Sequence, residues 1–162
     1  MKYIFTIIGS VVVTVTIVAF FFNLNQVNKE QVTLTTNLEQ RAILLADSLK
    51  ETVEPSYVNS SGDPLKTSLQ RTVDKFANRE RLAGIALYDN KSILLATSAG
   101  LPKAIINNQK SISDAMDSNT SRSDFFDAEG ETRYVFVDPL HNDIGSVVGA
   151  LMIVQNAGYI NT

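Results

Sequence analysis

Residues 122–155 read RSDFFDAEGETRYVFVDPLHNDIGSVVGALMIVQ and contain three runs of apolar and aromatic residues separated by two turns. The first turn is Glu129-Gly130, and the second is the polar segment from His141 to Gly145. Runs of this kind bounded by turn residues are typical of antiparallel strands, and the last run is apolar enough to be central in a sheet. The segment therefore predicts three strands, at 122–128, 131–140 and 146–155.

Upstream of this segment, two further short apolar runs, 82–89 and 92–98, are joined by Asn90-Lys91. This spacing predicts a β-hairpin with a tight turn. Residues 103–118 then carry apolar residues at helical spacing, interrupted by Asn107-Asn108, which suits either one broken helix or two short ones. We therefore expect five strands with a helical insert between the second and the third.

The region before the strands has a helical pattern. Residues 25–53 contain neither Gly nor Pro, and we expect one long amphipathic helix over 25–54 that Pro55 ends. A second helix opens at Asp63-Pro64, with Asp as the N-cap and Pro at the first helical position, and ends near 78–81. The apolar positions expected to face the core are Val27, Leu34, Leu38, Ala42, Leu45, Leu49 and Val53 in the first helix and Leu65, Leu69, Val73 and Phe76 in the second.

The start of the chain has the pattern of a membrane anchor. Residues 3–22 are almost wholly apolar, which gives about 30 Å of helix, enough to cross a bilayer once. Lys2 and the amino terminus precede this run and the flank after it is uncharged, so the positive-inside rule places the start in the cytoplasm. Phe20-Phe21-Phe22 stands where signal cleavage would need small residues, which favours an uncleaved anchor over a signal peptide.

This pattern predicts a single-pass protein of the inner membrane, with residues 1–23 as transmembrane anchor and 24–162 as a periplasmic or extracellular domain whose core is 63–156. Roughly 140 residues remain outside the anchor, which suits one compact domain. Of the 14 Lys and Arg only Lys2 precedes the anchor, so 13 basic groups face 17 acidic ones and nucleic acid is an unsuitable partner. The absence of Cys excludes disulfides, zinc-thiolate sites and thiol nucleophiles.

Little in the sequence indicates catalysis or metal binding. His141 is the only histidine, and no Gly-x-Ser-x-Gly motif accompanies it, so we expect no enzyme. Asp138, Asn142 and Asp143 lie close to it and could supply metal ligands, but such residues are ordinary turn formers between strands. Acidic pairs such as Asp124 with Asp127 are expected to face solvent. We therefore expect no catalytic residue, no metal and no cofactor.

Four blocks of the predicted sheet carry a family resemblance: LAGIALYD at 82–89, LLATSAGLP at 94–102, YVFVDPL at 134–140 and VGALMIV at 148–154. With the order of elements, they resemble the extracytoplasmic PAS-like or single Cache (sCache) sensor domains of bacterial transmembrane receptors. They are especially similar to those that precede HAMP linkers and trehalose-phosphate-synthase-like output modules.

The resemblance implies an α+β fold: the N-terminal transmembrane helix continues into the long helix, which packs across one face of a PAS-like five-stranded antiparallel sheet. It also implies a small-molecule pocket between the other face and the helical insert. After the last strand, at residues 156–162, a second membrane helix would be expected to begin.

The strands that would line such a pocket combine aromatic walls with hydroxyl and guanidinium donors. A site for a small polar or anionic ligand is built in this way. The alternative is that the aromatic residues are core and the arginines lie on a solvated strand face. The candidate ligand-binding residues are Tyr88, Thr97, Ser98, Arg122, Phe125, Arg133, Tyr134 and Phe136.

Two functions of different classes follow. The first is a membrane-anchored sensor that binds a small polar or anionic ligand, contacts the bilayer through residues 3–22, forms a homodimer through the long helix and transmits the signal through the membrane helix. The second is a pilin-like assembly subunit, which also runs an apolar helix into a long amphipathic one, although Phe5 stands where pilins need an acidic residue. A single-pass accessory protein without a ligand remains a further alternative.

Overall fold

The computed structural model describes residues 34–58, 61–77 and 82–158. The chain divides into two compact units, Met1–Asn37 and Leu38–Thr162, and the account below concerns the second unit. Within the described residues, no helix is both long and apolar enough to cross a membrane. The predicted anchor at 1–23 lies outside them.

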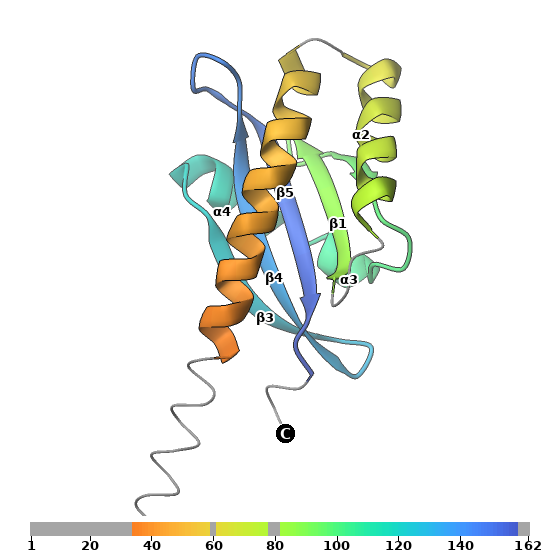
Figure 1. Cartoon of the computed structure of the whole chain (residues 1–162), viewed down its shortest axis with the longest axis vertical. Coiled ribbons are helices and arrows are strands. Elements are labelled where there is room, and N and C mark those ends of the chain that lie inside the picture. The colour runs from red at the N-terminus through yellow and green to blue at the C-terminus, as the bar shows by residue number, and fades with distance from the viewer. Residues whose placement is uncertain (1–33, 59–60, 78–81, 159–162) are drawn as a thin grey trace, which may run out of the picture. The chain divides into compact units, whose positions relative to one another are not determined.

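A five-stranded antiparallel sheet forms the centre of this unit (Figure 1). The strand order is β2-β1-β5-β4-β3, so the apolar β5 is the central strand and pairs with a neighbour on each side. The predicted α+β fold, with five strands and a helical insert between the second and third, is therefore confirmed. The strands are β1 (Leu82–Asp89), β2 (Leu94–Thr97), β3 (Arg122–Ala128), β4 (Glu131–His141) and β5 (Val147–Asn156).

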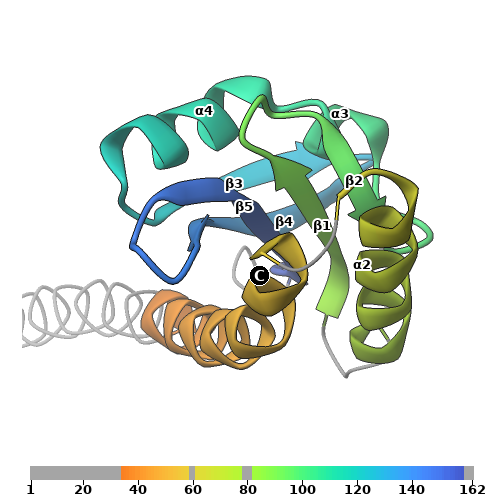
Figure 2. The ribbon, with the colours of Figure 1, turned by 90° about the horizontal axis from the view of Figure 1, so that it is seen from above.

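Alternation along the strands gives the sheet two apolar faces, and each face has its own core. On β4, Tyr134 and Phe136 belong to one core, whereas Val135 and Val137 belong to the other. This division arises because successive side chains of a strand point to opposite faces. Helices cover both faces (Figure 2).

The first face is covered by the N-terminal helix, whose described helical residues are 34–58, and by α2 (Asp63–Phe76) (Figure 2). Most of the apolar positions predicted to face the core are buried. Leu34 and Leu45 are only partly buried, Ala46 is buried although it was not predicted, and Val27 lies outside the described residues. The buried side chains are Leu38, Ala42, Ala46, Leu49 and Val53 of the N-terminal helix and Leu65, Leu69, Val73 and Phe76 of α2.

Two predicted helix boundaries are corrected. Pro55 does not end the N-terminal helix, which continues to residue 58. Beyond the proline, the hydroxyl of Tyr57 donates a 2.9 Å hydrogen bond to the carbonyl oxygen of Tyr88, and this tertiary contact holds the last turn against the sheet. In α2, Gly62 rather than Asp63 is the N-cap, at a φ of 66° that glycine adopts easily.

The insert consists of two short helices on the other face, α3 (Lys103–Ile106) and α4 (Gln109–Ser118) (Figure 2). Of the two forms that the sequence allowed, the structure adopts the separate helices. Asn107 closes α3, and the side chain of Asn108 accepts a hydrogen bond from the backbone N–H of Ser111 as the N-cap of α4. Ile105, Ile112 and Ala115 bury the insert against the sheet.

The first hairpin has a longer connection than predicted. β2 begins at Leu94, so residues 90–93 form the loop instead of Asn90-Lys91 alone. The carboxylate of Asp89 accepts hydrogen bonds from the backbone N–H groups of Lys91 and Ile93, each 2.8 Å long. An aspartate that bonds the backbone two residues onward stabilises such a turn, which explains the wider loop.

Candidate functional site

A groove of about 240 Å³ lies between α4 and the outer strands β3 and β4, on the face of the sheet that the insert covers. Its walls come from one helix and one edge strand, and its floor is apolar. The lining residues are Ser111 and Asp114 of α4, Arg122, Ser123, Asp124 and Phe126 of β3, and Val135 and Val137 of β4.

Regular spacing within each element places these side chains together. On β3, Arg122, Asp124 and Phe126 are two residues apart and so share one face. In the sheet register Arg122 is opposite Val137 and Asp124 is opposite Val135, which puts each charged group beside the apolar floor. Ser111 and Asp114 are three residues apart on α4 and face the groove from the helix side.

The groove carries both signs of charge. Arg122 supplies a guanidinium with five N–H donors, and Asp114 and Asp124 supply two carboxylates. None of the three takes part in the ion pairs found among the described residues. The groove can therefore offer a bidentate donor to an anionic group and carboxylate oxygens to a cationic group, above an apolar surface that contacts the rest of a small molecule.

Of the eight predicted site residues, only Arg122 lines this groove. Tyr88 is 1% exposed and lies beneath the insert, where its hydroxyl donates a 2.9 Å hydrogen bond to the carbonyl oxygen of Ile106. The Ser98 hydroxyl accepts from the backbone N–H of Ile85 and donates to its carbonyl oxygen. Both backbone groups of Thr97 bond the side chain of Gln70.

The other four predicted residues lie away from the groove as well. Tyr134 and Phe136 face the N-terminal helix, and the ring of Phe125 stands edge-on to Tyr134 with centroids 5.2 Å apart. Arg133 donates a 2.7 Å hydrogen bond to Asn156 Oδ1 and forms an ion pair with Glu131. The structure therefore does not bring the eight together, and their predicted role in binding is untested.

Most residues of the groove were not predicted from the sequence. Phe126, and not its neighbour Phe125, is the aromatic residue that faces the insert, because a shift of one residue along a strand moves a side chain to the opposite face. Asp124 is exposed, as expected, and it also lines the groove beside Arg122. The i, i+2, i+4 alternation of residues 122, 124 and 126 was the available signal, but only the position of α4 shows which strand face is covered.

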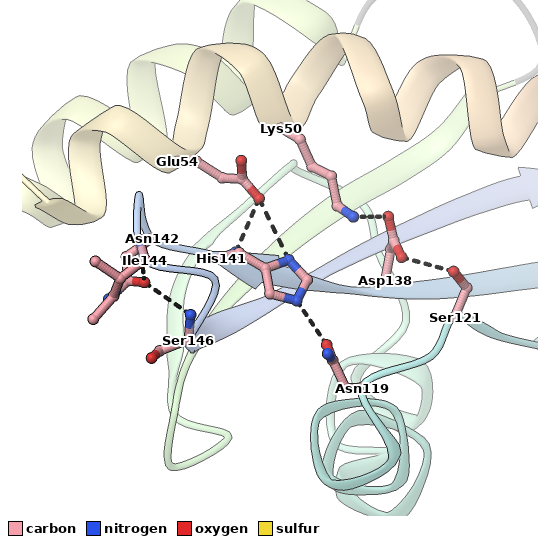
Figure 3. Close-up of polar contacts among 9 residues, drawn as sticks. All are labelled: Lys50, Glu54, Asn119, Ser121, Asp138, His141, Asn142, Ile144 and Ser146. Atoms are coloured by element: carbon pink, nitrogen blue, oxygen red, sulfur yellow. Dashed lines mark hydrogen bonds and ion pairs between the residues drawn. The ribbon is translucent and has the colours of Figure 1, made fainter.

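The surroundings of His141 do not form a metal centre. Among the residues that the structure describes, no group of three or more His, Asp or Glu side chains is placed to hold a metal ion. The ring of His141 instead contacts the side chain of Asn119 on one side and that of Glu54 on the other (Figure 3). Asn142 accepts hydrogen bonds from the backbone N–H groups of Ile144 and Ser146 and shapes the β4–β5 turn.

Two buried tyrosines, Tyr88 and Tyr134, and the partly buried Tyr57 should resist ionisation at high pH. Burial raises the pKa of Tyr57, Tyr88 and Tyr134 above the ordinary value of 10.0, and the charge of Asp89 raises that of Tyr57 further. Above pH 10 the unfolded chain releases phenol protons that the folded chain retains, so stability should fall as the pH rises through this range. We expect the native protein to show less than half the phenolate absorbance of the urea-unfolded chain near pH ~10.5. Superimposable titration curves would contradict the burial of these side chains.

No family model and no curated protein sequence matches the chain. Solved structures with a similar fold are sensory domains of bacterial chemoreceptors. The ligand-binding domain of the Pseudomonas aeruginosa PAO1 amino acid chemoreceptor PctC, in complex with GABA, has a TM-score of 0.57 at 12% identity over 84% of this chain and 62% of that one. That of Campylobacter jejuni Tlp3, in complex with L-valine, has 0.56 at 14% identity over 84% and 60%. The periplasmic sensory domain of C. jejuni Tlp1 has 0.52 at 16% identity over 82% and 59%.

At these identities the likeness shows a shared fold. It confirms the expected fold, whereas the sensor role, the PAS-like or single Cache type and the HAMP or trehalose-phosphate-synthase-like context stay predictions. This chain spans about six tenths of the length of the chemoreceptor domains that it matches.

Proposed function

We propose that this chain is an extracytoplasmic sensor domain that binds a small charged molecule in the groove between α4 and β3. The observation that carries the proposal is Arg122, which lines one groove with the carboxylates of Asp114 and Asp124 above an apolar floor and forms none of the ion pairs found among the described residues. The groove, at about 240 Å³, is smaller than the pockets that hold drug-sized ligands and so suits a small metabolite.

The charges of the groove define the ligand class. A purely anionic ligand would be attracted by Arg122 but repelled by two carboxylates, whereas a molecule with a carboxylate and an ammonium can satisfy both. GABA and L-valine, bound by the similar chemoreceptor domains, carry both groups. The sequence-based expectation of a small polar or anionic ligand is thus narrowed to a polar zwitterion of the amino acid type.

The remaining features of the sensor hypothesis belong to the same proposal. Residues 3–22 anchor the chain in the inner membrane with the folded unit outside, as the charges around the apolar run suggest. The N-terminal helix pairs with a second copy, which is supported by Leu44, 70% exposed, and Ile43, 41% exposed. Ligand binding shifts the helix, and the chain has a binding role and not a catalytic one.

The ligand class can be tested by thermal shift of the full chain purified in mild detergent. Glycine, L-valine, GABA, putrescine, succinate and glucose are the probes, and we expect a rise in Tm with at least one zwitterion. Arg122→Gln should weaken that binding by about tenfold or more, because the ligand carboxylate loses a charged bidentate partner. Lys110→Gln is the matched control, since Lys110 is exposed on α4 and does not line the groove. Melting that no probe changes, or equal affinity in Arg122→Gln, would contradict the proposal.

A further inference from the structure

Polar contacts join the N-terminal helix to the loop between the two walls of the groove (Figure 3). They come from four separate parts of the chain: the helix, the end of α4, the start of β3 and the end of β4. We call this set the polar bridge, and its members are Lys50, Glu54, Asn119, Ser121, Asp138 and His141.

The first branch of the polar bridge runs through Asp138. Lys50 Nζ lies 2.5 Å from Asp138 Oδ2, and the hydroxyl of Ser121 donates a 2.7 Å hydrogen bond to Asp138 Oδ1. Asp138 is only 6% exposed, so its carboxylate finds its polar contacts in these two side chains instead of in water. Ser121 directly precedes Arg122, and Asp138 directly follows Val137, which is opposite Arg122 in the sheet. This branch therefore ends at Ser121, the residue that precedes Arg122 in the chain.

The second branch runs through His141. Glu54 Oε1 accepts a 2.9 Å hydrogen bond from the backbone N–H of His141, and His141 Nε2 donates a 2.6 Å hydrogen bond to Asn119 Oδ1. Asn119 is the C-cap of α4, with a φ of 50° in the left-handed region that asparagine tolerates better than most residues. This branch therefore ends at the helix that carries Ser111 and Asp114.

The two branches together clamp the loop at 119–121, which connects α4 to β3 and hence one wall of the groove to the other. Both reach the N-terminal helix, at Lys50 and Glu54, which are one turn apart and side by side. A change in the separation of the two walls must either move these two residues or break a polar contact of the bridge. The carboxylate of Asp138 is buried, so breaking its contacts is costly.

We infer that the polar bridge couples the groove to the N-terminal helix, with Lys50 and Glu54 as positioning residues that bind no ligand themselves. The inference rests on the proposed function, in which the groove is the ligand site. Coupling between two sites is reciprocal, so a substitution in the helix must change the stability of the groove walls even without ligand. The two proposals can therefore fail separately.

The test is native-state hydrogen exchange of the full chain, without ligand, read by mass spectrometry. Lys50→Met keeps the aliphatic stem and removes the ammonium. We expect it to raise exchange of the backbone amides in residues 109–123 by at least about fivefold, although the ion pair of Lys50 is with Asp138 of β4. If this variant does not fold, Ser121→Ala decides the question, because it removes one hydrogen bond at an exposed site and should raise exchange in residues 46–58.

Gln70→Ala is the matched control. It removes two hydrogen bonds to Thr97 at the opposite edge of the sheet, and it should raise exchange around α2 and β2 while residues 109–123 keep the wild-type rate. The inference is overturned if each bridge variant changes exchange only in its own element and β4, or if Gln70→Ala affects residues 109–123 as strongly as Lys50→Met does.

Discussion

Replacing Gly149 with alanine should cost about 3 kcal/mol or more in the free energy of unfolding, the largest effect expected of any single methyl group in this chain. Gly149 lies on β5, next to the paired strand β1 and close to Tyr57 of the N-terminal helix. A Cβ there would overlap the carbonyl oxygen of Tyr88 and would stand 3.1 Å from the ring of Tyr57. The obstructing oxygen is backbone, and it accepts the hydroxyl hydrogen of Tyr57, so it cannot move without loss of that bond.

Urea unfolding followed by far-ultraviolet circular dichroism measures this effect. Gly158→Ala is the control, because a Cβ at Gly158 meets no atom within 4 Å and the same added methyl group should leave stability within about 0.5 kcal/mol. An unfolding midpoint for Gly149→Ala equal to that of Gly158→Ala would show that the carbonyl oxygen of Tyr88 does not approach Gly149 as described.

Leu49→Ala should cost about 3 kcal/mol, because it leaves a cavity between the N-terminal helix and the sheet. Leu49 is 0% exposed and belongs to the core that this helix shares with α2 and the strands. Leu44 offers a matched control on the same helix, since its side chain is 70% exposed and points away from the sheet.

The same urea unfolding experiment separates the two leucines. Leu44→Ala removes the same atoms from the solvent side and should change stability by no more than about 0.5 kcal/mol. Equal losses in the two variants would contradict the burial of one helix face, whereas a loss in Leu44→Ala that depends on protein concentration would support the proposed homodimer through this helix.

Much of the fold follows from local pattern. The apolar runs of residues 122–155 predicted three strands, and the turn at Glu129-Gly130 predicted the hairpin of β3 and β4. The errors lie at the ends of helices and strands, where a contact with a residue distant in sequence outweighs the local conformational preference. Pro55 failed to end its helix because Tyr57 reaches the backbone of β1, and that partner is 31 residues away in the sequence.

The groove was harder to predict because no sequence pattern indicates how α4 packs against β3 and β4. The sequence places Arg122, Asp124 and Phe126 on one strand face, but both faces of this sheet are covered by helices. Whether a strand residue faces core or groove therefore depends on where α4 lies. Tyr134 and Phe136 illustrate this. They were predicted to line the ligand pocket, and the structure places them in the core beneath the N-terminal helix.

The sequence by itself determined the order of helices and strands, the central place of β5 and the amphipathic character of both helices on the first face, because periodicity and turn chemistry act over a few residues. The tertiary structure alone decided which charges meet. Lys50 with Asp138 and Glu54 with His141 come together only when the N-terminal helix packs on the sheet, since no local pattern encodes contacts between such distant residues. Arg122 and Asp114 line one groove only because α4 packs on the other face.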